Sequence, residues 1–181
     1  MKKIFIATAL LLTVISFTAS AQTDKGDWLV GGQLAFNTTS GNSSFTLAPS
    51  AGYFFGKNFA AGSELTLSFS KLGDSKTTAV GIGPFARYYF ELKDPKFKPL
   101  VHASFGFVSI TDKFLNQKTT NTATSLFIGA GGAYFINDNV ALEGVMGYNN
   151  TKVENEKAEG GFLFRIGFQI HLLGHEVRSK K

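Results

Sequence analysis

The feature that most constrains the fold of this chain is an alternation with a period of two residues, which recurs in eight segments of about ten residues each. Successive side chains of a β-strand point to opposite faces, so this alternation predicts strands that each have one apolar face. The expected strands cover residues 27–37, 45–55, 60–70, 78–90, 101–108, 125–136, 140–149 and 162–172. In the last and clearest of them, the large apolar residues at every second position are Phe162, Phe164, Ile166, Phe168, Ile170 and Leu172. A tilted strand of about ten residues is long enough to cross a bilayer.

The connections between these segments alternate in length. The shorter ones fall at residues 56–58, 92–98 and 137–139, where Gly, Asn, Asp and Pro supply turn chemistry. Longer polar loops are expected at residues 38–44, 71–76, 111–122 and 150–159. Short turns at one end and long loops at the other are typical of outer-membrane barrels. The sequence therefore predicts one all-β domain, an eight-stranded antiparallel up-and-down β-barrel.

The polarity of the two strand faces separates a membrane barrel from a soluble one. A soluble eight-stranded cup of the lipocalin type has apolar residues inside and charged residues on its water-facing side. In this chain the apolar face carries no charge, and the opposite face consists mostly of Gly, Ala, Ser and Thr. Lipid tolerates the first face and a narrow lumen suits the second, so we expect a transmembrane β-barrel.

Four charged residues lie inside the expected strands, all on the small-residue face: Glu64, Arg87, Glu143 and Arg165. A lone charge in a confined lumen is costly, so two acidic and two basic groups there predict a paired lumen charge network that plugs the barrel. Because they lie on neighbouring strands, we expect Glu64 to pair with Arg87. We expect Glu143 to pair with Arg165 for the same reason. Four further polar residues on this face are available as partners, namely Gln33, His102, Gln169 and His171.

Aromatic residues of the apolar face fall at two levels. Those near the short-turn end are Trp28, Tyr53, Phe55, Tyr88, Phe90 and Tyr134. Those near the long-loop end are Phe36, Phe45, Phe69, Phe107, Tyr148 and Phe162. Two aromatic belts, one at each membrane interface, are typical of a barrel that spans a bilayer.

The first 21 residues have the pattern of a cleavable secretory signal peptide. Lys2 and Lys3 form a positive start, residues 4–17 are mainly apolar, and residues 19–21 form a small-residue cleavage site. The mature chain would begin at Gln22 with a net charge lowered from +5 to +3, which does not suggest a nucleic-acid-binding protein. The absence of Cys excludes disulfides, thiolate metal sites and a lipid anchor on Cys.

Three motifs carry a family resemblance: residues 47–54 (LAPSAGYF), 83–90 (GPFARYYF) and 167–170 (GFQI). In these motifs the chain from residue 22 to 173 resembles the small outer-membrane β-barrel domain family, whose best-known members are barrels of the OmpA and OmpX type. The resemblance implies a barrel in the bacterial outer membrane, folded by the barrel-insertion machinery, and it implies no catalytic residue. Residues 174–181 continue as a polar C-terminal tail, whereas such barrels usually end at an aromatic residue. Pro49 and Pro84 cannot donate to a ladder, so we expect a β-bulge at each.

Three functions are compatible with these observations. The first is a non-enzymatic barrel with a structural or envelope-interaction role, exterior loops and a plugged polar lumen. The alternative is a small transporter or narrow channel for apolar or small solutes, like barrels of the OmpW type. The third is a barrel-embedded lipid A-modifying hydrolase, which would use His102 or His171 with Ser104 and Glu143. No motif indicates a cofactor or metal site.

The expected partners are the lipids around the barrel. Six lysines fall in the long loops: Lys71, Lys76, Lys113, Lys118, Lys152 and Lys157. Because the length asymmetry places these loops outside the cell, the lysines could bind the phosphates of lipopolysaccharide as point charges. The simpler interpretation is that they are solvated loop residues. We expect no nucleic-acid partner and a monomeric barrel.

Overall fold

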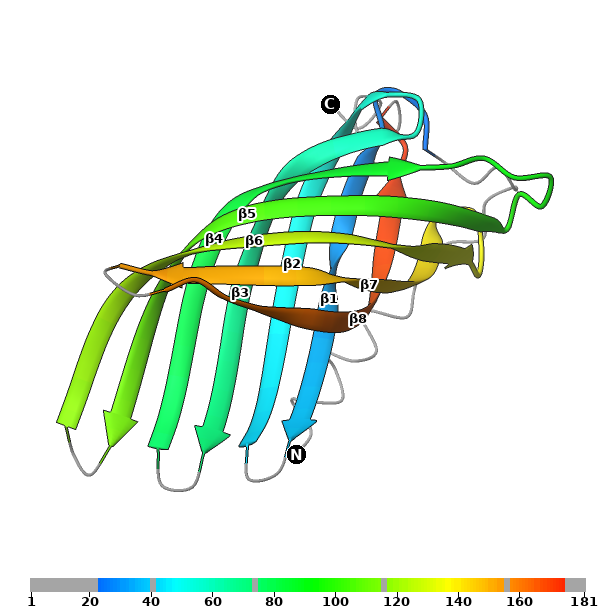
Figure 1. The fold of residues 1–181 in the computed structure, drawn as a ribbon. Helices are drawn as coiled ribbons and strands as arrows, with labels where there is room; N and C mark the ends of the chain where they lie inside the picture. Colours follow the sequence, from blue (N-terminus) through cyan, green and yellow to red (C-terminus); the bar gives the residue numbers. More distant parts are fainter. Residues whose placement is uncertain (1–22, 40–41, 73–74, 115–116, 155–156, 175–181) are drawn as a thin grey trace, which may run out of the picture.

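The computed structural model describes residues 23–39, 42–72, 75–114, 117–154 and 157–174. The expected signal peptide therefore lies outside the described residues, as does the C-terminal tail beyond Gly174. The strands are β1 (Trp28–Thr39), β2 (Asn42–Gly56), β3 (Phe59–Leu72), β4 (Ser75–Tyr89), β5 (Phe97–Phe114), β6 (Gln117–Phe135), β7 (Val140–Val153) and β8 (Glu159–Leu172). Each pairs with the next in antiparallel register, and β8 pairs with β1 to close the barrel (Figure 1). The predicted fold class is confirmed.

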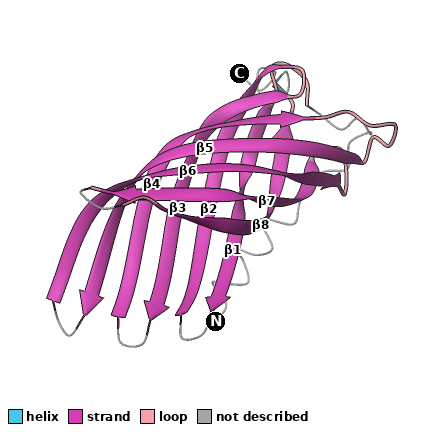
Figure 2. Cartoon of the chain, in the orientation of Figure 1, coloured by secondary structure: helices cyan, strands magenta, loops and turns pink. Residues whose placement is uncertain are grey.

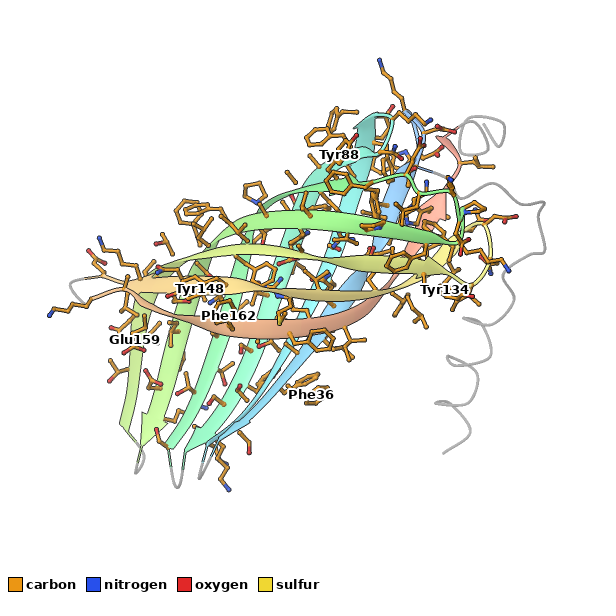
Figure 3. The ribbon with its side chains drawn as sticks, turned by 45° about the vertical axis from the view of Figure 1, so that its right-hand side comes forward. Phe36, Tyr88, Tyr134, Tyr148, Glu159 and Phe162 are labelled. Carbon is orange, nitrogen blue, oxygen red and sulfur yellow. The ribbon has the colours of Figure 1, made fainter. Side chains whose placement is uncertain are left out.

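The described chain consists of strands and short connections (Figure 2). No helix in this part of the chain is long and apolar enough to cross a membrane. The strand alternation sorts the side chains as predicted: Ile82, Ile128 and Ile166 are more than half exposed on the outside, and Phe54, Tyr89 and Phe127 are buried inside. Tyr88 and Tyr134 lie toward one end of the wall, and Phe36, Tyr148 and Phe162 toward the other (Figure 3).

The predicted long loops are wrong in one respect, because most of their residues continue the strands. Only residues 40–41, 73–74 and 115–116 separate the strands of the first three hairpins at this end. Thr111 of β5 still pairs with Thr120 of β6, well beyond the apolar stretch of either strand. Thr and Ser suit a β-strand on a water-exposed surface, so the ladder persists past the apolar band. Three of the hairpins extend side by side at the lower left of Figure 1.

The two prolines in the wall are accommodated without the predicted bulges. Pro49 remains in register with Gly32 of β1, and Pro84 with Ser63 of β3. Each proline instead lacks a ladder pair on its other side, toward β3 and β5 respectively, and the register is unchanged on both sides of the gap. A strand residue directs its N–H to one neighbour only, so each proline interrupts one ladder, over two consecutive pairs, and needs no inserted residue.

The seam that closes the barrel is short. The ladder between β1 and β8 runs from Trp28↔Leu172 to Leu34↔Ile166 and stops there, although both strands continue in the described part of the chain. By contrast, β1 pairs with β2 along its whole length. Beyond Leu34 the two strands diverge (Figure 1).

Candidate functional site in the barrel lumen

The centre of the lumen is crossed by one ion pair. Arg87 of β4 and Glu143 of β7 both point inward, and Arg87 Nη1 lies 2.7 Å from Glu143 Oε2 and 3.0 Å from Oε1. Both residues are at most 3% exposed. The hydroxyl of Tyr89, two positions after Arg87 on the same face, donates to Glu143 Oε1 at 2.9 Å. This arrangement satisfies the carboxylate with charged and neutral donors, as a buried charge requires.

A second ion pair lies beside the first. Arg165 of β8 donates to Glu64 of β3 at 3.1 Å, and its guanidinium carbon lies 3.8 Å from the ring centroid of Phe127. Ser104 Oγ donates to the same Glu64 carboxylate at 3.3 Å. The His102 ring lies between the two pairs: Arg87 Nε donates to His102 Nδ1 at 3.2 Å, and His102 Nε2 lies 3.6 Å from Glu64, beyond hydrogen-bond distance.

The structure thus brings the four strand-interior charges together, but the predicted partners within neighbouring strands are wrong. Glu64 is in register with Gly83, which is four residues from Arg87 and therefore about 13 Å along the strand. Across a narrow lumen, side chains from non-adjacent strands come closer than that. Each arginine therefore pairs with a glutamate on a non-adjacent strand.

Inward aromatic residues fill the space around the ion pairs. Phe127 sits over Gly129 and Gly147, where a Cβ would collide with its ring, so these glycines make room for it. Phe85 sits against Gly52 of β2 in the same way. Gln33 and Gln169 line β1 and β8, and their side-chain amides hydrogen bond to no other described residue, so they do not join the charge network.

Buried side chains also narrow the lumen at the end where the described residues begin and end, at Thr23 and Gly174. Thr23 is buried in this mouth, where its hydroxyl donates to Asn58 Oδ1 at 2.5 Å and accepts from Lys98 Nζ at 2.7 Å. Outside it, Lys57 Nζ lies 2.9 Å from Glu91. The hydrogen bond from Lys57 lowers the pKa of the Glu91 carboxyl below its ordinary value.

Toward the hairpin end, the lumen opens into a cavity of about 210 Å³. Its walls are rich in hydroxyl and amide groups, including Thr46, Thr66, Ser68, Ser125, Asn149 and Thr151. Glu64 and Arg165 also line it, so the second ion pair forms part of its surface. We call this space the vestibule.

The residues of the hydrolase hypothesis are not assembled into a catalytic group. Ser104 donates to Glu64 and not to Glu143, while His102 Nδ1 accepts from Arg87 and is not available as a base toward Ser104. His171 packs among the rings of Phe54, Tyr89 and Phe135. Within the described residues, no three His, Asp or Glu side chains gather as metal ligands.

The structure brings four of the six predicted lysines into one row. Lys71 and Lys76 are register partners, as are Lys76 and Lys113, and Lys113 and Lys118. The other two are not in this row, because Lys152 is in β7 opposite Thr124 and Lys157 follows the end of β7. This row could not be predicted from the sequence, because the segments were expected to be loops, where no register exists.

Tyr89 and Ser104 also belong to the charge network, although the sequence did not predict this role for them. Tyr89 shares the inward face with Arg87 at a spacing of two, and Ser104 shares it with His102. That spacing was visible in the sequence, but their partners on distant strands were not.

Comparison with known proteins agrees with this architecture. The chain is 30% identical to an uncharacterized protein of Haemophilus influenzae, over 91% of this chain and 99% of that protein. Among solved structures, Neisserial surface protein A superposes with a TM-score of 0.62 at 19% identity, over 81% of this chain and 97% of that one. The N-terminal β-barrel domain of Pseudomonas aeruginosa OprF gives a TM-score of 0.57 at 17% identity, over 82% and 98%. These two structures support the fold alone. The sequence profile described as "Outer membrane protein beta-barrel domain" matches residues 7–171, so this chain belongs to the outer membrane protein β-barrel domain family and is a bacterial outer-membrane barrel.

Proposed function

We propose that this protein is a non-enzymatic barrel that is closed to solutes and that presents its extended hairpins at the cell exterior. Its role is structural and interactive: the wall anchors the protein in the outer membrane, and the hairpins contact envelope components. The expected export by a signal peptide and insertion as a monomer belong to the same proposal.

The single observation that best supports the proposal of a closed lumen is the buried Arg87–Glu143 pair. It spans the lumen from β4 to β7 at 2.7 Å, and the side chains around it leave both groups almost without solvent contact. An eight-stranded barrel has an interior only wide enough for its own side chains. A solute would therefore have to break a buried ion pair to pass, which is costly.

A narrow channel is the second candidate, and the vestibule favours it because part of the lumen is already open to about 210 Å³. Conductance across a planar lipid bilayer distinguishes the two. We expect the wild-type barrel to show no stable conductance. We expect the Arg87→Ala, Glu143→Ala, Thr23→Ala variant to conduct small ions, because it removes both the central ion pair and the buried hydrogen-bonded side chain that narrows the opposite mouth.

The matched control removes the exposed pair Lys57 and Glu91, which has the same charges but lies outside the lumen. The Lys57→Ala, Glu91→Ala variant should stay closed. Stable, ion-selective openings of the wild-type protein would contradict the closed-lumen proposal and support the channel.

A further inference from the structure

A row of lysines follows the strand register across the hairpin end. It consists of Lys71, Lys76, Lys113 and Lys118, which are consecutive register partners on β3, β4, β5 and β6. We call it the lysine row. Lys71, Lys76 and Lys113 are exposed, and strand alternation puts them on the outward face, as it does Phe69 and Thr78 two positions away.

Within the described residues, Lys71, Lys76 and Lys113 form no ion pair. Like charges directly opposite each other on neighbouring strands are destabilising, so the row has an unbalanced repulsion. The acid next to it in sequence does not relieve this repulsion. Asp112 belongs to the inward face, where it accepts a hydrogen bond from Thr77 Oγ1 at 2.5 Å. No described acidic side chain balances the charges of Lys71, Lys76 and Lys113.

An apolar groove lies next to two of these lysines. Phe36, Phe45 and Phe69 are successive register partners on β1, β2 and β3, and the rings of Phe36 and Phe45 are 4.9 Å apart. Together with Lys71 and Lys76 they line a groove of about 370 Å³ on the outside of the wall. Phe36 is 72% exposed and points away from the barrel (Figure 3).

The height of each lysine above the apolar band decides which of them can meet a lipid head group. Lys71 is two residues beyond Phe69, about 7 Å along the strand. Lys113 is six residues beyond Phe107, about 20 Å along its own strand. The lysine row therefore rises from the edge of the apolar surface at Lys71 toward the tip of the β5–β6 hairpin.

We propose that this groove binds a phosphorylated, acylated glycolipid of the outer leaflet. Its phosphate lies between Lys71 and Lys76, and one acyl chain lies along Phe36, Phe45 and Phe69. Register partners are about 5 Å apart, so two ammonium groups can reach one phosphate as point charges. The part of the groove lined by phenylalanines is apolar, and its rim of two lysines is cationic. The groove therefore matches both the acyl chain and the phosphate of such a lipid. Lys113, higher on the surface, faces the sugar side.

This inference rests on the part of the proposed function that puts the hairpins in the outer leaflet. Its test uses the folded full chain in dodecyl maltoside micelles, with folding of each variant verified by its faster migration on an unheated denaturing gel. The probes are diphosphorylated lipid A, lipid A without phosphate, and the phosphorylated disaccharide without acyl chains. Binding is measured by native mass spectrometry across a lipid titration.

We expect the wild-type chain to prefer diphosphorylated lipid A over both other probes. The Lys71→Gln, Lys76→Gln variant should bind it about tenfold less tightly, because two charged contacts to one phosphate are lost. Phe69→Ala should weaken it about fivefold through lost apolar contact. Raising the salt concentration should reduce the effect of the lysine change, since these charges are exposed.

The matched controls lie on another part of the wall. Lys152→Gln, Lys157→Gln removes the same charge from the β7–β8 hairpin, and Phe162→Ala removes a belt residue of β8 that is 80% exposed. Both should change lipid A affinity by no more than about twofold. Equal losses from the two lysine pairs, or equal binding of lipid A without phosphate, would overturn the site. Equal binding of the disaccharide would overturn the acyl groove. None of these binding results depends on conductance. The closed-lumen proposal can therefore fail while the lipid site is supported, and the reverse.

Discussion

At the scale of single residues, we expect the stability of the barrel to depend on which charged side chains are in contact in the lumen. Arg87 and Glu143 are in direct contact, while Arg87 and Glu64 lie on neighbouring strands at different heights. Removing one member of a buried pair leaves the other unpaired, so Arg87→Ala should destabilise the barrel by about 3 to 5 kcal/mol. In the double variant with Glu143→Ala the loss should be much less than the sum of the two single losses.

Equilibrium unfolding in urea from lipid vesicles gives these free energies. The same cycle on Arg165 with Glu64 should also show strong coupling, because the two are 3.1 Å apart. The Glu143 and Arg165 pair, expected from the sequence but not formed, is the comparison and should couple less. Additive effects for Arg87 with Glu143 would mean that the contact contributes nothing in the membrane.

At the scale of strands, the apolar alternation predicted the transmembrane part of the wall and failed outside it. Ile128 and its outward neighbours on β6 show the pattern because lipid requires it. Beyond the apolar band, β5 and β6 are mainly polar, so residues 111–122 looked like a loop, although residues 111–114 and 117–122 are paired strand. The turn chemistry at Asn58 was visible, and Asn58 does adopt a positive φ of 65°. The partners across the lumen could not be predicted, because they depend on strand stagger and not on any local pattern.

The polar extension of the β5–β6 hairpin should contribute little to stability, because it buries no apolar surface in the bilayer. Replacing residues 112–119 by Asn-Gly would close the hairpin on the Thr111↔Thr120 pair with a two-residue turn. We expect the free energy of unfolding in lipid to change by less than about 1 kcal/mol. Ile128→Lys, in contrast, puts a charge on the lipid face where Ile128 is 58% exposed, and should cost about 2 to 4 kcal/mol. A hairpin deletion as damaging as this lysine would show that the extension supports the barrel.

At the scale of the whole molecule, closure of the barrel wall depends on the ladder between β1 and β8. The β1–β8 ladder ends at Leu34↔Ile166, whereas β5 and β6 pair from Phe97 to Phe114. Unpaired backbone groups in a bilayer are costly unless they face a hydrated space, and beyond the seam Leu163 and Arg165 of β8 line the polar vestibule. We therefore expect unfolding to begin where β1 and β8 separate.

The absence of Cys allows a clean test of this order of events. A disulfide between Leu34→Cys and Ile166→Cys, which are register partners at the end of the seam, should slow unfolding in lipid by about tenfold or more. The matched disulfide joins Leu67→Cys to Val80→Cys, register partners in the β3–β4 hairpin. It should leave the unfolding rate almost unchanged. A cross-link slows unfolding only if the two strands that it joins have already parted in the transition state, so the rate, and not the midpoint, identifies the first opening. Equal slowing by both cross-links would place that opening elsewhere in the wall.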